Sequence, residues 1–390
     1  MKQVVMAEFS DVRHDARVLK EAATLAGGGY KVLLIMYNAS LDRKRQSEGN
    51  NVFFVEIPFE KRYDTANWYH RIGRLFAFLR VLASYTFEVL RAKGEYYHAH
   101  NFYIGWLVYI SSVIHKGKFV YDCHEIIWEN DGSFVYRVGI LIEKYMTAHA
   151  LVAIAPSSDR SRLLAEHYKL DRSPIVLSNY PNLTAPHPSP GNRLKKQLGI
   201  AFDAKILFFS GMLSVKTRLQ DNILRALPSL PENVYFVAVG FGHPGEVRYL
   251  AQIARELRVR HRFIILPPVG HRELHEYAAC ADIGMCLLAD LGLAMRFHAL
   301  NKFYEYASAG LAVLASDFPT FRKEILENPV GPMGAVCDPH DAASVAESLK
   351  DLLADPTRLT TYRRNALRLH ERIWNWEAQQ KTLIQAYAQI

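Results

Sequence analysis

The sequence predicts an α/β fold of two units, each built on a doubly wound parallel sheet. Runs typical of buried strands alternate with helical stretches along the whole chain, and one proline-rich segment over residues 179–191 interrupts this alternation. A length of 390 residues is enough for two domains of ordinary size. Hydrophobic residues make up 50% of the chain, so each unit has enough apolar side chains for its own core.

The predicted strands of the first unit are continuous apolar runs, which are typical of parallel strands that helices cover on both faces. The first run is too short for a signal peptide. No run approaches the roughly 20 apolar residues of a transmembrane helix. The predicted strands are Val4–Phe9, Lys31–Tyr37, Val52–Pro58, Tyr96–Asn101, Lys118–His124, Leu151–Ala155 and Ile175–Ser178.

A helix is predicted between the first two strands, because three glycines at residues 27–29 supply a stop signal. Asp15 is its expected N-cap, since a carboxylate there accepts hydrogen bonds from free amides. Arg17, Lys20 and Glu21 are expected on the solvated face of this helix.

The alternation of strands and helices restarts after the proline-rich segment, which is expected to be a linker. Ligands of open α/β sheets bind outside the carboxyl ends of the strands, so two such units predict a cleft lined by those ends. The predicted strands of the second unit are Ile206–Gly211, Val234–Gly240, Phe263–Val269, Ile283–Leu288, Ala312–Ser316 and Gly334–Asp338.

The most informative stretch spans residues 301–317 and predicts a short helix, a stop at Gly310 and a buried strand. The amides and the dipole of a helix N-terminus favour phosphate. Lys302 adds an ammonium group, and Glu305, one turn further on, suits two ribose hydroxyls. The stretch therefore predicts a site for a nucleotide diphosphate that carries a second group.

The same stretch resembles the donor-site segment of retaining glycosyltransferases of family 4 (group 1), which have the two-domain GT-B fold. The family segment runs from a Pro-Asn-Lys sequence through Glu-Tyr and Ala-Gly to a second proline. Leu300 and Ala312 stand here at the two proline positions. The family often carries another glutamate eight positions before Glu305, where this chain has Phe297.

The resemblance implies three parts of the chain. Residues 1–180 would form the acceptor domain and residues 181–370 the domain that binds the nucleotide sugar. Residues 371–390 would form a final helix that packs back on the first domain, because Trp374-Asn375-Trp376-Glu377 is similar to the family's ending. An ordinary amphipathic terminal helix is equally consistent with these residues.

The resemblance also implies the roles of residues at the donor site. Arg218, in the loop after the first strand of the second unit, and Lys302 would stabilise the leaving diphosphate electrostatically, without a metal or another cofactor. The loop before Glu273 would bind the base through its main chain. The implied donor-binding residues are Gly211, Lys216, Gly240, Pro268, Val269, Asn301 and Glu305.

Histidines end two neighbouring strands of the first unit, in segments similar to the family's His-x-His and Asp-x-His-Glu patterns. His124 is a candidate for binding a donor hydroxyl or assisting a proton transfer. Glu125 is a candidate for orienting the acceptor or His124. The expected acceptor-binding residues are Arg13, His14 and His100.

A net charge of +8 favours anionic partners. No nucleic-acid-binding signature accompanies it, so nucleic acid is not expected. Residues 68–90 carry aromatic residues at helical spacing with arginines between them, which suits an anionic membrane surface. A helix packed in the core explains the same residues equally well.

The cysteines predict neither a disulfide framework nor a metal site. Four cysteines without paired spacing fit a reducing cytosol, which predicts a cytoplasmic protein, with the inner face of the membrane as a further location. Cys337 and His340 alone make a poor metal site, so no metal is expected.

The leading functional prediction is transfer of a sugar from a nucleotide diphosphate sugar, UDP-linked among other options, to an acceptor hydroxyl in polysaccharide or glycoconjugate biosynthesis. The acceptor is open, and a lipid-linked one is among the options. Two alternatives stay open: an epimerase or hydrolase of the same fold, and a non-catalytic member that binds a nucleotide or a partner. The altered loop at Gly211 and the residue at position 297 give the last one weight.

Overall fold

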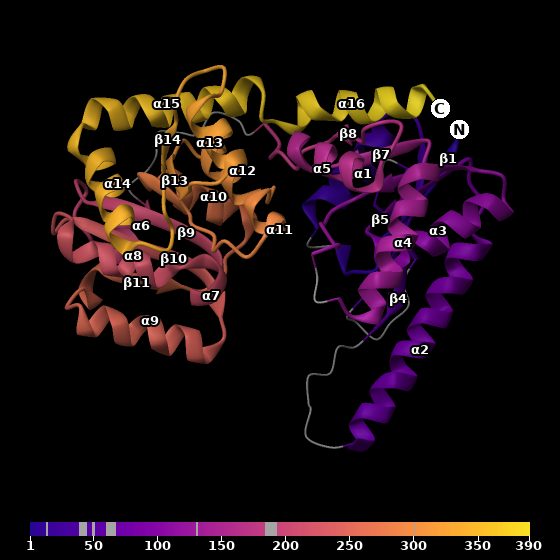
Figure 1. The fold of residues 1–390 in the computed structure, drawn as a ribbon, viewed down its shortest axis with the longest axis horizontal. Coiled ribbons are helices and arrows are strands. Elements are labelled where there is room, and N and C mark those ends of the chain that lie inside the picture. The colour runs from indigo at the N-terminus through magenta and orange to yellow at the C-terminus, as the bar shows by residue number, and fades with distance from the viewer. Residues whose placement is uncertain are drawn as a thin grey trace. The chain divides into compact units, whose positions relative to one another are not determined.

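The computed structural model describes residues 1–12, 15–38, 45–48, 51–59, 68–129, 132–183, 193–299 and 301–390. The chain divides into two compact units. Unit 1 comprises Met1–Asn179 together with Gln379–Ile390, and unit 2 comprises Tyr180–Ala378 (Figure 1). Each unit contains one sheet, and the fold class predicted from the sequence is confirmed.

The sheet of unit 1 has the order β3-β4-β2-β1-β5-β6-β7-β8. All neighbouring pairs are parallel except β3 with β4. The order reverses between β1 and β5, which makes their carboxyl ends the topological switch point. The strands are β1 (Gln3–Ala7), β2 (Lys31–Asn38), β3 (Arg45–Glu48), β4 (Val52–Pro58), β5 (Tyr96–His100), β6 (Lys118–Asp122), β7 (Val152–Ala155) and β8 (Ile175–Val176).

The sequence predicted each of these strands except β3. That strand has only four residues, all polar, and its pairing with β4 is antiparallel, so it lacks the apolar run that marks the others. At several carboxyl ends the predicted strands run on by one or two residues beyond those of the structure.

Helices α2, α3 and α4 pack side by side on the sheet of unit 1, and the core between them is rich in Tyr, Val and Ile. Among the helices of the described residues, none is long and apolar enough to cross a bilayer. The helices of this unit are α1 (Ala16–Gly27), α2 (Trp68–Arg91), α3 (Phe102–Ile114), α4 (Phe134–His149) and α5 (Ser158–Tyr168).

Helix α1 begins as predicted, but its solvated face was assigned wrongly. The carboxylate of Asp15 accepts hydrogen bonds from the amides of Arg17 and Val18, at 3.0 and 3.3 Å. The side chains of Arg17 and Glu21 are buried rather than solvated. Partners from other elements, described below, compensate the charge of Arg17 inside the unit.

The sheet of unit 2 is parallel throughout and has the order β11-β10-β9-β12-β13-β14. This is the doubly wound order with its switch point between β9 and β12. Apolar cores cover both faces of the sheet. The strands, all six of which the sequence predicted, are β9 (Lys205–Leu213), β10 (Val234–Gly242), β11 (Phe263–Leu266), β12 (Ile283–Cys286), β13 (Ala312–Ser316) and β14 (Gly334–Cys337).

The helices of unit 2 follow the strands in alternation. They are α6 (Arg193–Leu198), α7 (Val215–Arg218), α8 (Gln220–Ala226), α9 (Pro244–Glu256), α10 (His271–Ala279), α11 (Leu293–Arg296), α12 (Asn301–Ser308), α13 (Pro319–Leu326), α14 (Ala342–Ala354) and α15 (Pro356–Arg372). The stop predicted at Gly310 is confirmed, because its φ of +71° is the left-handed conformation that favours glycine at a helix end.

The last helix, α16 (Trp376–Ala388), begins in unit 2, and its residues from Gln379 onward belong to unit 1. Tyr387 is fully buried there, with its ring 5.6 Å from that of Tyr30 and 5.1 Å from that of Tyr96. Its hydroxyl lies 2.8 Å from Nδ1 of His98. The terminal helix therefore packs on the sheet of unit 1.

Candidate functional site

The candidate donor site lies at the carboxyl edge of the sheet in unit 2, at the switch point between β9 and β12. Two segments converge there: α7, which follows β9, and the first turn of α12. A hydrogen bond of 3.1 Å from the amide of Ala289 to the carbonyl of Thr217 ties the loop after β12 to α7. The site is therefore assembled from three separate stretches of the chain.

Lys302, in the first turn of α12, crosses directly over Gly211 on β9. A Cβ atom on Gly211 would lie 2.5 Å from Cε of Lys302, so a side chain there would force the end of the lysine to move. The φ of Gly211, +123°, also favours glycine. Gly240 on β10 pairs with Gly211, and a Cβ atom there would lie 1.9 Å from the carbonyl oxygen of Gly211.

Arg218 and Glu305 lie near Lys302, because all three charged groups act on the pKa of the Cys286 thiol. Burial raises the pKa of this thiol to about 12. Lys302 and Arg218 act in the opposite direction, and Glu305 raises the pKa further. All three charged groups are thus near enough to Cys286 to act on its ionisation. Burial also lowers the pKa of Arg218, whose guanidinium is only partly exposed.

The two cations at this edge have no anionic partner in the described part of the chain. No described carboxylate lies within ion-pair distance of Arg218 or Lys302. Within the described part of the chain, the side chain of Lys302 makes a single hydrogen bond, a long one of 3.4 Å from Nζ to Oγ of Ser210. The nearby Asp290 is instead paired with Arg296 at 2.6 Å. Two positive charges are therefore left for an external anion.

The remaining predicted donor residues share this edge to different degrees. Asn301 is exposed at the start of α12, where the helix N-terminus adds its own preference for anions. Pro268 and Val269 follow β11, two strands away from β9, and Pro268 is exposed. Lys216 is exposed, and its side chain makes no hydrogen bond or ion pair with the described residues. Of the two cations of α7, Arg218 is therefore the one that the fold holds near Lys302.

The site in unit 2 also contains residues that the sequence analysis missed. The hydroxyl of Tyr306 accepts a hydrogen bond of 3.0 Å from the amide of Ser210, and the ring of Tyr306 packs against Gly284 of β12. Tyr306 thereby fixes α12 against both strands of the switch point. Its place in the motif, directly after Glu305, was a usable signal, because neighbouring helical residues face in different directions.

A second cluster lies at the carboxyl edge of unit 1 and is centred on the buried carboxylate of Asp122. This carboxylate accepts two hydrogen bonds of 2.7 Å from the guanidinium of Arg17. It also contacts Nε2 of His124 at 2.9 Å and Nδ1 of His100 at 3.2 Å. The two histidines touch each other at 3.1 Å. The predicted pair is therefore brought together, with Asp122 and Arg17 as unpredicted partners.

Burial and charge oppose each other in this cluster. Burial alone would raise the pKa of Asp122, but Arg17 and His124 outweigh it and hold this pKa well below its usual range. Burial likewise works against a charged His124, yet Asp122 prevails and the pKa of His124 is raised. Burial lowers the pKa of His100, which keeps that ring neutral. The partly exposed His124 is therefore the proton-carrying histidine of the pair.

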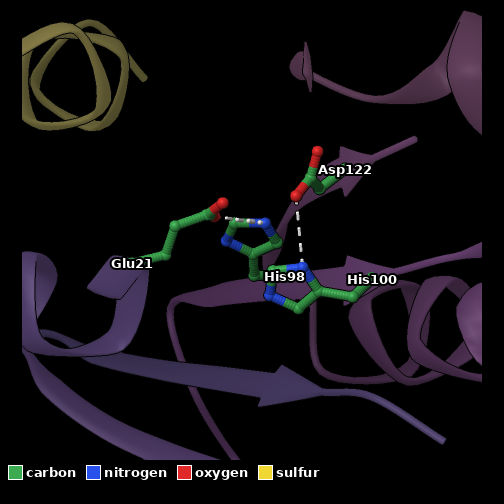
Figure 2. A group of neighbouring side chains, drawn as sticks. All are labelled: Glu21, His98, His100 and Asp122. Atoms are coloured by element: carbon green, nitrogen blue, oxygen red, sulfur yellow. Dashed lines mark hydrogen bonds and ion pairs between the residues drawn. The ribbon is translucent and has the colours of Figure 1, made fainter. Parts of the chain in front are cut away.

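Glu21 and His98 continue the cluster into the interior (Figure 2). Oε2 of Glu21 lies 3.6 Å from Nε2 of His98, and Oε1 lies 3.2 Å from Nε of Arg17. Burial, with Asp122, raises the pKa of Glu21 well above its usual range, and burial lowers that of His98 well below. Both shifts favour the neutral forms, a protonated Glu21 beside an uncharged His98.

The group Glu21, His98, His100 and Asp122 offers metal-type ligand atoms that all lie within 4.8 Å of one another. Arg17 already contacts both of the carboxylates. A divalent cation would have to share those carboxylates with the guanidinium, which repels it. The donor set therefore fits a network of charge pairs better than a metal site.

Helical spacing could have identified Glu21 as buried. It lies three residues after Val18 and four before Leu25, both of which are apolar, and this spacing puts all three on one face. No comparable signal identified the partners of Glu21, because His98 on β5 and Asp122 on β6 are distant from it in the sequence.

Two other predictions for unit 1 have different outcomes. Glu125 is exposed, next to His124 in sequence, and no hydrogen bond joins the two side chains among the described contacts. Arg13 and His14 lie outside the described residues. Glu8, which was not predicted, directly follows β1 and accepts hydrogen bonds of 3.3 Å from the side-chain amide of Asn101. Burial raises the pKa of Glu8 to about 7.

Two doubly wound units, one with a cationic edge at its switch point, define a protein of the GT-B class. Two family models match the chain: "Glycosyltransferase Family 4" over residues 16–178 and "Glycosyl transferases group 1" over residues 192–368. Together the two matches extend over most of both units. The chain therefore belongs to the group 1 glycosyltransferases of family 4.

Individual proteins are similar to the chain at lower identity. The D-inositol 3-phosphate glycosyltransferase of Xylanimonas cellulosilytica is 27% identical over 264 residues, which cover 64% of this chain and 60% of that protein. The sucrose-phosphate synthase of Thermosynechococcus elongatus has a TM-score of 0.76 at 16% identity, and the match covers 100% of this chain and 99% of the synthase chain. HepE of Anabaena, in complex with UDP-glucose, has a TM-score of 0.72 at 17% identity, and both chains are covered completely. The two structural likenesses concern the fold.

Proposed function

We propose that this protein is an enzyme that transfers a sugar from a nucleotide diphosphate sugar to an acceptor hydroxyl. One observation carries the proposal: Arg218 and Lys302 converge at the switch point of unit 2 without a carboxylate partner among the described residues. Two uncompensated cations beside a helix N-terminus suit the diphosphate of such a donor.

The same groups would act on the chemical step. Negative charge grows on the diphosphate as the bond to the sugar breaks, so cations fixed at that position stabilise the transition state more than the bound substrate. Lys302 is held by its close approach to Gly211, and Arg218 by the short helix α7. Glu305, near both, would bind the ribose hydroxyls. We propose that the reaction retains the anomeric configuration and needs no metal, as the family resemblance implies.

Unit 1 would contribute the groups that handle the sugar and the acceptor. His124 is partly exposed at the carboxyl edge, and Asp122 raises its pKa, so it can hold a proton near neutral pH. It would bind a hydroxyl or assist a proton transfer, with His100 as its inner neighbour and the exposed Glu125 beside it. Arg13 and His14 remain proposed acceptor contacts on the strength of the resemblance.

The comparisons narrow the choice of donor and leave the acceptor open. The complex of HepE with UDP-glucose makes UDP-glucose the first donor to test. The chain spans about 60% of the length of the D-inositol 3-phosphate glycosyltransferase that it matches. The name of that relative makes an inositol phosphate one acceptor to try. We propose a role in cytoplasmic polysaccharide or glycoconjugate synthesis, with lipid-linked acceptors as a further option.

Calorimetric titration with UDP, GDP, UDP-glucose and GDP-mannose tests the proposal. We expect one nucleotide series to bind and Lys302→Ala and Glu305→Ala to weaken that binding strongly, whereas Lys350→Ala, at an exposed lysine of α14 in the same unit, leaves it unchanged. With an identified acceptor, Lys302→Ala should lower turnover about 10²–10³-fold, the usual cost of removing one preorganised contact. Hydrolysis or epimerisation of most of the donor without acceptor would contradict transfer, and absence of any nucleotide binding would contradict an enzyme of this class.

A further inference from the structure

The outer side of the helix layer on unit 1 is unusually apolar. Helix α3 contains no charged residue. Its residues Tyr103, Trp106, Ile110 and Val113 are all exposed, and Val113 is 60% exposed. Their spacing of three and four residues places them in one stripe along the helix. A surface helix of a globular protein normally carries polar residues in this position.

The two neighbouring helices extend this stripe. On α4, Phe134 is 80% exposed and Leu141 is 69% exposed, and Tyr145 lies one turn after Leu141. On α2, Phe76 and Phe87 are also exposed. Exposed apolar residues that are grouped on neighbouring elements indicate an interaction surface, whereas single exposed apolar residues scattered over a protein are common.

Packing shows that the three stripes face the same way. One side of α3 contacts β1, β5 and β6, and its flanks contact α2 and α4 (Figure 1). On the α2 flank, the hydroxyl of Ser111 donates to the carbonyl of Val89 at 2.8 Å. On the α4 flank, the ring of Tyr109 lies 5.5 Å from that of Tyr145. The exposed stripes therefore lie on the side of the layer opposite the sheet, and we call this surface the α2–α4 face.

The charges on the α2–α4 face have one sign. Among the described side chains of the three helices, both carboxylates, Glu88 and Glu143, are buried. The charged side chains that are exposed are basic, and Arg91 pairs in addition with Glu88 and lies over the ring of Phe87. The exposed basic side chains are Arg80, Arg91, Arg137 and Lys144.

We propose that the α2–α4 face docks on the surface of an anionic lipid bilayer. Aromatic and aliphatic side chains would enter the boundary between headgroups and acyl chains, and the basic residues would contact anionic headgroups. Tyr and Trp suit this boundary because they combine an apolar ring with a polar group. The charge favours this partner over a second copy of the chain, since a symmetric dimer would bring like charges together.

This inference goes beyond the proposed transfer reaction and uses none of its residues. It also assigns the membrane surface to residues other than those that the sequence suggested. The sequence pointed to residues 68–90 alone, and the side chains of residues 68–75 lie outside the described part of the structure. The strongest apolar stripe belongs to α3, which carries no arginine and so showed no amphipathic pattern.

Flotation with lipid vesicles tests the proposal on the full chain. Vesicles of phosphatidylcholine alone are compared with vesicles of equal parts phosphatidylcholine and phosphatidylglycerol. We expect binding to the anionic vesicles that weakens with salt. Ile110→Glu combined with Leu141→Glu should lower the affinity more than about tenfold. Arg137→Glu combined with Lys144→Glu should lower it by about thirtyfold or more. The control, Phe202→Glu, changes an equally exposed apolar residue of unit 2 and should bind like the wild type.

Two further readouts make the test decisive. When anionic vesicles are added, hydrogen exchange of the wild-type amides in α3 and α4 should slow. This measurement does not depend on the folding of any variant. Titration with UDP should be unaffected by all four face substitutions, which separates a failure of docking from a failure of the donor site. No binding to anionic vesicles, or binding that the face variants keep, would overturn the proposal. A concentration-dependent dimer that Ile110→Glu abolishes would assign the face to a second copy instead.

Discussion

The carboxyl edges of the two sheets have the same topology and opposite electrostatics. In unit 1, Arg17, Asp122 and His124 compensate one another within 2.9 Å. In unit 2, Arg218 and Lys302 have no carboxylate partner among the described residues. A doubly wound sheet therefore does not decide what its edge does. A network that is neutralised from within holds a histidine in place, whereas cations without an internal partner are available to an external anion.

The largest expected effect comes from breaking the internal network of unit 1. Asp122→Asn would leave the buried Arg17 without its carboxylate, which typically costs about 3–5 kcal/mol. Hydrogen exchange of the β6 amides, which reports the stability of unit 1 separately from that of unit 2, measures the loss. Asp159→Asn, at a partly exposed carboxylate of α5, is the control and should change little. An Asp122→Asn protein as stable as the wild type would show that the network is not a structural unit.

Glu8 should make the stability of unit 1 depend on pH. Its pKa is raised from 4.5 to about 7 in the folded state, so the folded state holds the proton more tightly than the unfolded state. The associated stabilisation is complete below pH 4.5 and is lost as the pH rises through about 7, in total about 3 kcal/mol. Stability measured against pH for the wild type and Glu8→Gln should diverge over this interval, with the variant gaining relative stability at higher pH. Parallel profiles would contradict the raised pKa.

Arg218→Ala should reverse the pattern of Asp122→Asn. Because no internal carboxylate depends on Arg218, unit 2 should keep its stability, and the affinity for the nucleotide diphosphate should fall by about 1.5–3 kcal/mol, the worth of a hydrogen bond to a charged group. Calorimetric titration and thermal unfolding of the same samples measure both quantities, with Lys350→Ala, at an exposed lysine of α14, as the control. A clear loss of stability without a loss of affinity would make Arg218 a structural residue like Arg17.

The smallest expected effect is that of Tyr387→Phe in the terminal helix. The substitution removes the hydroxyl that contacts His98 at 2.8 Å and leaves a buried ring nitrogen without that partner, at a cost of about 1 kcal/mol. Hydrogen exchange of the β5 amides should show the change, and Tyr109→Phe, at a more exposed hydroxyl, should not. Equal exchange in both variants would mean that α16 is held by apolar contacts alone.

The sequence predicted the strands of both sheets well because parallel strands buried on both faces form continuous apolar runs. It missed β3, whose four polar residues carry no such run. It also predicted correctly the short helix that contains Lys302 and Glu305, the stop at Gly310 and the strand that follows. Helix, stop and strand follow one another within a few residues there, so local rules suffice.

Residues whose role depends on distant partners were beyond the reach of local rules. Arg17 was expected in solvent, since a lone arginine on a helix is normally solvated, and only the carboxylate of Asp122 from β6 makes its burial favourable. The close approach of the Lys302 side chain to Gly211 likewise joins two segments that are distant in the sequence.

The sequence by itself determined the alternation of strands and helices, the two-unit organisation and the order of helix, stop and strand over residues 301–317, because each depends on neighbours along the chain. The tertiary structure alone decided which charges neutralise one another and which are left for a ligand. Electrostatic energy depends on the distance and burial of groups from different elements, and the fold sets both quantities only when the sheets have formed.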